Sequence, residues 1–213
     1  MPAPAVITFL LNILSAVVAL LTSYYAYRFN RLVDNSLLRA ISVGFMLLGV
    51  GLLVDAGTSL VSGRLLVESF AERILILLAS FTYLALQMVA YLLIAMGYAR
   101  AAYGREAKGV APLVLGGAAG VGLYSFALLS YFVALVLLAF VVFQGFLLRS
   151  REKNRFSAIV LLAFGLIFAA HLVLLLSVLT LGTGLFLVGT GVQFLGFLSL
   201  LVFVVRSEVV GPG

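Results

Sequence analysis

The sequence contains no cysteine and no tryptophan, one histidine, four prolines and few charged residues. Without cysteine the chain has no disulfide, no thiolate metal site and no cysteine nucleophile. One histidine with few acidic residues does not supply a zinc ligand set, so we expect no metal and no cofactor. Charged residues make up 9% of the 213 residues, whereas a soluble domain has about a quarter. This shortage of charge excludes an ordinary soluble domain.

Hydrophobic residues make up 65% of the chain and form runs of the length that crosses a bilayer, roughly 20 residues each. We therefore predict an all-α, multi-pass protein of the cell membrane, with one transmembrane domain over residues 1–213 and the lipid bilayer as its main partner. The seven expected spans are residues 5–27, 37–61, 74–98, 109–127, 130–148, 156–180 and 185–205. The N-terminal segment lacks Lys and Arg, so we expect the first run to be retained rather than cleaved as a signal peptide.

The middle of the chain, from Gly109 to Leu148, has no charged residue. A helix of that length would measure about 60 Å, twice the bilayer core of about 30 Å. We therefore expect two spans here, joined by a turn near Ser125 to Ser130. The first of them is rich in glycine and includes a GxxxG spacing at Gly116 and Gly120, which permits close helix packing.

The positive charges predict the orientation of the helices. Of the thirteen Lys and Arg residues, all except Arg64 and Arg73 fall on one side of the seven expected spans. The positive-inside rule then places the N-terminus outside and the C-terminus inside. The net charge of +6 is explained by this bias, so we expect no nucleic-acid partner.

The chain carries a weak internal repeat. Arg28 aligns without a gap on Arg149, and in the third span of each half Gln87 aligns on Gln193, thirteen residues before an arginine in both cases. The sequence therefore predicts two parallel halves of three spans joined by one connecting span. Such repeats place binding sites near the middle of the membrane, at the interface between the halves.

This 3+1+3 outline is similar to that of SWEET sugar transporters and of microbial rhodopsins, and the similarity extends to architecture only. SWEET-type proteins carry prolines within their repeat helices, whereas the prolines here are Pro2, Pro4, Pro112 and Pro212. Microbial rhodopsins hold retinal on a lysine of the seventh helix, and residues 185–205 contain no lysine. We therefore assign the chain to neither family.

Four polar residues inside the expected spans are the candidate ligand-binding residues: Asp55, Gln87, His171 and Gln193. A carboxylate in the membrane is expensive, so Asp55 is either a substrate, ion or proton site or the partner of Arg73 or Arg64. His171 either senses pH and relays protons or makes a hydrogen bond between helices.

The two glutamines occupy matching depths, and Asn12 and Gln144 add two more amides within the spans. Buried amides need hydrogen-bond partners. They form either a polar cluster that binds a small neutral or zwitterionic ligand, or contacts that hold the helices together.

These residues leave three hypotheses for function. The first is a protein that binds or transports a small molecule or lipid at a polar site between its halves. The second is a structural, accessory or sensory subunit with no ligand site, which acts with a membrane partner or as a homo-oligomer. The third is an intramembrane enzyme using Ser125 or Ser130 with His171, although the sequence has no Gly-x-Ser-x-Gly elbow and no assigned catalytic residue.

Overall fold

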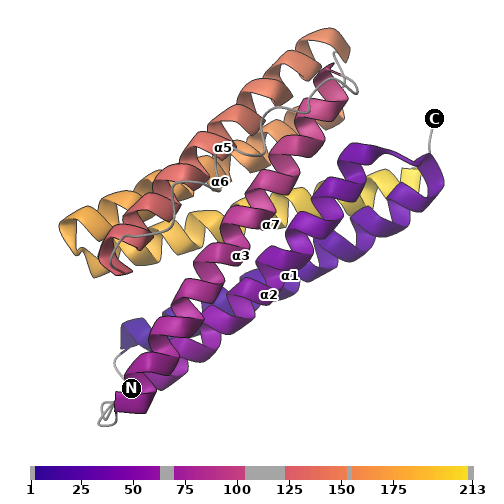
Figure 1. Cartoon of the computed structure of the whole chain (residues 1–213). Helices are drawn as coiled ribbons and strands as arrows, with labels where there is room; N and C mark the ends of the chain where they lie inside the picture. The colour runs from indigo at the N-terminus through magenta and orange to yellow at the C-terminus, as the bar shows by residue number, and fades with distance from the viewer. Residues whose placement is uncertain (1–2, 63–69, 104–122, 153–154, 211–213) are drawn as a thin grey trace.

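The computed structural model describes residues 3–62, 70–103, 123–152 and 155–210, which form a bundle of long helices (Figure 1). The helices are α1 (Ala3–Val33), α2 (Ser36–Ser62), α3 (Phe70–Tyr103), α5 (Leu123–Glu152), α6 (Arg155–Thr180) and α7 (Thr183–Val210). All 6 are long and apolar enough to cross a membrane. The described parts of the chain contain no strand. The fold is therefore an all-α bundle of membrane-spanning helices.

Six of the seven expected spans each lie within one of these helices. Most of the remaining span, residues 109–127, lies outside the described residues. The turn expected at Ser125 to Ser130 is wrong, because α5 continues unbroken from Leu123 to Glu152. No glycine or proline interrupts residues 123–144, and a serine can stay in a helix by hydrogen-bonding to a preceding carbonyl.

The connections between paired helices are short and use side-chain and backbone caps. The side-chain Oδ1 of Asn35 accepts a 2.9 Å hydrogen bond from the Leu37 N–H and so caps the start of α2. At the end of α6, Leu181 adopts a positive φ of 52°, and the Gly182 N–H donates to the Ser177 carbonyl at 3.1 Å. This Schellman-type ending allows α7 to begin directly at Thr183.

The helices form a closed ring in the order α1, α2, α3, α5, α6, α7, with α7 packed back on α1. Helices α3 and α5 are parallel neighbours in this ring (Figure 1). Tyr83 of α3 and Tyr131 of α5 line one cavity. Fifteen residues further along α3 and fourteen further along α5, Gly145 faces the ring of Tyr98. The last turn of α3 and the first turn of α5 therefore lie at opposite ends of the bundle.

Close contacts at glycine hold several helix pairs together. A Cβ atom added at Gly44 of α2 would lie 3.1 Å from the Ala90 carbonyl oxygen of α3. A Cβ atom added at Gly196 of α7 would lie 3.1 Å from the Ala163 carbonyl oxygen of α6. Small residues at such crossings let two helix backbones approach closely. In a bilayer the hydrophobic effect does not drive helices together, so the van der Waals contacts made at these crossings are a main source of stability.

The charged side chains divide between the two ends of the bundle. One end, called here the basic end, carries most of the arginines whose side chains are described: Arg28, Arg31, Arg39, Arg100, Arg149 and Arg206. Arg73 lies at the opposite end, called here the Arg73 end. Between the two ends, many leucine, valine and phenylalanine side chains are exposed on the outside of the ring. An apolar belt with charges at its edges is the surface expected of a bundle surrounded by lipid.

Candidate functional site

A cavity of about 190 Å³ lies inside the ring, and all six described helices contribute to its wall. It is named here the polar cavity, and its lining residues are Asn12, Asp55, Ser80, Tyr83, Leu84, Tyr131, Leu174, Val178, Phe186, Thr190 and Gln193. Asp55 stands seven residues before the end of α2 at Ser62, or about 10 Å along the helix axis. The polar cavity therefore lies in the half of the bundle nearer the Arg73 end.

Asp55 is held in the polar cavity by a neighbouring helix. The side-chain Nδ2 of Asn12 on α1 donates a 2.7 Å hydrogen bond to Oδ2 of Asp55. Arg73, the cation expected to pair with Asp55, is exposed, and no described Lys or Arg forms an ion pair with this carboxyl group. Arg64, the other expected partner, lies outside the described residues. Asp55 thus presents an acidic group to the cavity, with the side chains of Asn12 and Thr58 as its hydrogen-bonding neighbours.

Gln193 of α7 supplies an unused hydrogen-bond donor to the same cavity. Its side chain is 3% exposed, and its Nε2 atom has no hydrogen-bond partner. A buried donor without a partner costs free energy of about 1–3 kcal/mol. Because this side chain lines an open space, a water molecule or a ligand with an acceptor atom can remove that cost. Gln193 is therefore a candidate contact for a bound solute.

Two tyrosines form aromatic walls of the cavity, and the sequence analysis did not single them out. Tyr83 of α3 and Tyr131 of α5 are both buried. Tyrosines usually gather at the membrane interface, as Tyr24 and Tyr27 do at the end of α1. Tyr83 lies well inside the expected span 74–98, and this position is a signal for it. Tyr131 is the second residue of the expected span 130–148, so its position gave no such signal. An aromatic face next to a carboxylate is a typical environment for an organic cation.

His171 lies at the centre of a second polar group, on α6. The Ile167 carbonyl oxygen lies 2.8 Å from the ring Nδ1 and can only accept, so Nδ1 carries the proton. Nε2 then accepts from Gln87 Nε2 at 2.5 Å and from the Tyr91 hydroxyl at 3.2 Å. Gln87 and Tyr91 belong to α3, so His171 bridges two helices that are not neighbours in the ring.

This arrangement limits the chemistry that His171 can perform. Both ring nitrogens are occupied by hydrogen bonds, whereas a general base for a serine nucleophile needs one nitrogen free. The Nδ1–H form with an accepting Nε2 is the neutral imidazole. His171 therefore serves as a fixed acceptor that ties α3 to α6.

The four candidate residues fall into two adjacent groups. Asp55 and Gln193 line the polar cavity, while Gln87 and His171 form the second group and do not belong to its lining. Tyr131 connects the groups, because it lines the cavity and its ring centroid lies 6.2 Å from that of His171. The two glutamines, expected at matching depths, therefore play different parts: one is satisfied by a histidine, and the other faces open space.

A layer of aromatic rings separates the polar cavity from the basic end. Phe45 of α2 packs edge-on against Phe197 of α7, with ring centroids 5.4 Å apart. Tyr98 of α3 packs edge-on against Phe164 of α6, with centroids 5.7 Å apart. All four side chains are buried. Among the described helices, two aromatic pairs therefore lie between the polar cavity and the basic end.

Comparison with protein-family models, curated proteins and solved structures finds no match to this chain. The fold and the site are therefore the evidence for its class. Apolar helices in a closed bundle, with polar groups gathered inside it, are typical of a multi-pass integral membrane protein.

Proposed function

We propose that the protein binds a small zwitterionic solute in the polar cavity, with its cationic group at Asp55 and an acceptor group at Gln193. The observation that supports this proposal best is the juxtaposition of two side chains: an acid that forms no ion pair with a described Lys or Arg, and a buried amide donor without a hydrogen-bond partner among the described residues. An intramembrane ionisable residue is a functional candidate by default, because nothing in lipid compensates for its cost.

The cationic end of the solute fits the surroundings of Asp55. An ammonium group there donates a charge-assisted hydrogen bond to the carboxylate, and the rings of Tyr83 and Tyr131 offer electron-rich faces. The side chains of Asn12 and Thr58 hydrogen-bond to the Asp55 carboxyl group, which fixes its position at the cavity wall. The site thus favours a positive charge on a compact group.

The other end of the solute fits Gln193. Its Nε2 donor is suited to a carboxylate or carbonyl oxygen, and the Thr190 hydroxyl of the same helix also lines the cavity. The volume of 190 Å³ equals that of about six water molecules at ~30 Å³ each. These limits favour a solute of the size of a small amino acid or a betaine over a sugar or a lipid.

We also propose that the N-terminus and the polar cavity face the outside of the cell, and that the segment between α3 and α5, which includes most of the expected span 109–127, supplies a seventh crossing. The gathering of arginines at the basic end supports this orientation through the positive-inside rule. The parallel direction of α3 and α5 supports a crossing between them. The ring order supports two equivalent halves. If α1, α2 and α3 correspond to α5, α6 and α7, then the contact of α1 with α7 corresponds to the contact of α5 with α3, and the structure has both contacts.

The experiment is a thermal-stability screen of the purified chain in detergent against glycine, alanine, glycine betaine and methylamine. A ligand that binds only the folded state stabilises it by RT ln(1 + [L]/Kd), about 2.7 kcal/mol at a hundredfold excess over Kd. We expect a zwitterion to stabilise the wild type and to lose this effect in the variants Asp55→Asn and Gln193→Leu.

A matched control is Asp34→Asn, which removes an exposed carboxylate at the connection between α1 and α2. This variant should respond to the solute as the wild type does. Equal stabilisation of wild type and Asp55→Asn would contradict the proposed site. If no zwitterion or amine stabilises the wild type, the polar groups serve helix packing, as the accessory-subunit hypothesis expects. Uptake of the stabilising solute into vesicles that contain the protein would distinguish a carrier from a receptor.

A further inference from the structure

A second, larger hollow lies on the outside of the ring, between α5 and α6, and it is named here the lateral groove. Its volume is about 890 Å³. It is lined by Ala139, Val142, Phe143, Phe146 and Arg149 of α5 and by Ala158, Leu161, Leu162, Gly165, Leu166 and Phe168 of α6. Apart from Arg149 the lining is apolar, so the groove is independent of the polar cavity and of the function proposed for it.

The lateral groove has the length of one lipid leaflet. From Ala139 to Arg149 the wall on α5 extends ten residues, or about 15 Å along the helix, and the wall on α6 has the same extent. Half of a bilayer core of about 30 Å is also about 15 Å. An acyl chain that enters the groove from the basic end therefore reaches the middle of the membrane where the groove ends.

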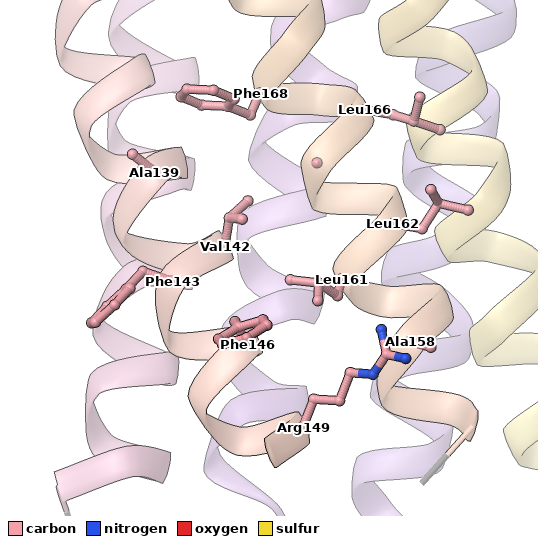
Figure 2. Close-up of a pocket in the computed structure, with 11 residues that line it drawn as sticks. Ala139, Val142, Phe143, Phe146, Arg149, Ala158, Leu161, Leu162, Leu166 and Phe168 are labelled. Carbon is pink, nitrogen blue, oxygen red and sulfur yellow. The ribbon is translucent and has the colours of Figure 1, made fainter. Parts of the chain in front are cut away.

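The charge in the lateral groove stands at one end of it. Figure 2 shows the Arg149 side chain extending from the last turn of α5 toward α6, beside Ala158, while the apolar lining residues lie further along both helices. Arg149 is exposed and belongs to the basic end, at the level expected for lipid headgroups. A guanidinium at this level matches a phosphate oxygen in both charge and geometry.

The width of the groove depends on small residues on α6. A Cβ atom added at Gly165 would meet nothing within 4 Å, so the space beside this glycine is open. On the α5 side, Phe143 and Phe146 are 57% and 60% exposed and form a bulky aromatic rim. A hollow with an open floor and a raised rim accommodates a thin flexible chain better than the flat face of a second helix.

We propose that the lateral groove binds one anionic phospholipid of the leaflet at the basic end, with an acyl chain between α5 and α6 and the phosphate at Arg149. The occupant is a phospholipid because the groove combines leaflet length, apolar walls and a single terminal cation. An anionic headgroup is favoured because the segment that follows Arg149 adds Arg151, Lys153 and Arg155 against one acid, Glu152. Clusters of basic residues beside a membrane span attract anionic lipid.

Native mass spectrometry of the full chain tests this site by counting lipids retained after extraction. The protein is loaded in detergent with phosphatidylglycerol or with phosphatidylcholine. We expect the wild type to retain one phosphatidylglycerol in preference to phosphatidylcholine, and Arg149→Gln to reduce that affinity about fivefold. Arg206→Gln, which removes an arginine at the same end but outside the groove, should leave it unchanged.

A second pair of variants tests the acyl-chain part of the site. Gly165→Leu should fill the groove and abolish retention of the lipid, whereas Gly57→Leu, which also projects into open space but on α2, should not. Equal retention by wild type, Arg149→Gln and Gly165→Leu would overturn the proposal. A wild-type dimer that Gly165→Leu converts to a monomer, with no change in bound lipid, would also overturn it in favour of a second copy of the chain.

Discussion

Asn12 on α1 and Asp55 on α2 meet inside the membrane-spanning part of the bundle, where the amide Nδ2 donates to the carboxyl Oδ2 at 2.7 Å. The two residues are far apart in the sequence and come together because α1 and α2 pack as an antiparallel pair. This contact fixes the acidic group of the polar cavity, so its removal affects stability and binding together.

The first prediction concerns this pair. Asn12→Leu should lower the free energy of unfolding by about 1–3 kcal/mol, because it leaves the part-buried carboxyl group of Asp55 without the Asn12 donor. Unfolding in mixed micelles of mild and denaturing detergent measures the change. The double variant Asn12→Leu and Asp55→Leu should recover part of the loss, since it removes both polar groups. Additive effects of the two single changes would show that the contact contributes nothing.

The second prediction concerns His171. His171→Leu should cost about 1–2 kcal/mol of unfolding free energy, because it removes the acceptor shared by Gln87 and Tyr91 in an apolar environment. Tyr91→Phe should cost less, since its hydrogen bond is the longer one at 3.2 Å. The same mixed-micelle titration measures both. A larger effect of Tyr91→Phe than of His171→Leu would contradict this description of the cluster.

The third prediction concerns helix packing at glycine. Gly44→Leu should destabilise the bundle by about 1–3 kcal/mol or more, because even a Cβ atom there lies 2.7 Å from Ile94 and 3.1 Å from the Ala90 carbonyl oxygen. Gly57→Leu on the same helix is the matched control and should be close to neutral, since its Cβ meets nothing within 4 Å. The midpoint of thermal unfolding checks the pair. Similar midpoints for the two variants would contradict the close contact.

The fourth prediction concerns orientation. The natural chain has no cysteine, so a single introduced cysteine is the only site for a maleimide reagent. In intact cells a membrane-impermeant maleimide should label Gly182→Cys, at the turn on the Arg73 end, and should leave Asn35→Cys unlabelled until the cells are opened. The reverse pattern would place the basic end outside and would contradict the proposed topology.

The helices were predictable from the sequence because lipid imposes a simple length and composition rule. Apolar runs of about 20 residues and charged connections identified six helices within a few residues of their ends. The helices extend beyond the apolar runs, as α3 does from Phe70 to Tyr103, because a helix can continue into the interface once nucleated. The rule failed at Ser125 to Ser130, where the absence of charge gave no signal for a helix end.

The candidate site was predictable only in part. Polarity inside a span singled out Asp55, Gln193 and His171, because a buried polar group always needs an explanation. Which of these residues face one another depends on the rotation of each helix about its axis. The sequence does not reveal this rotation, because the lipid-facing side and the core-facing side of each helix are both apolar. Tyr83 and Tyr131 were not singled out because tyrosine was grouped with the hydrophobic residues in the composition.

The positions of the aromatic pairs Phe45–Phe197 and Tyr98–Phe164 bear on how a solute could cross the bundle. If the protein carries a solute that binds beside Asp55, these four rings lie between that solute and the basic end. Passage toward the basic end along this path would then require the packing of α2, α3, α6 and α7 around the rings to change.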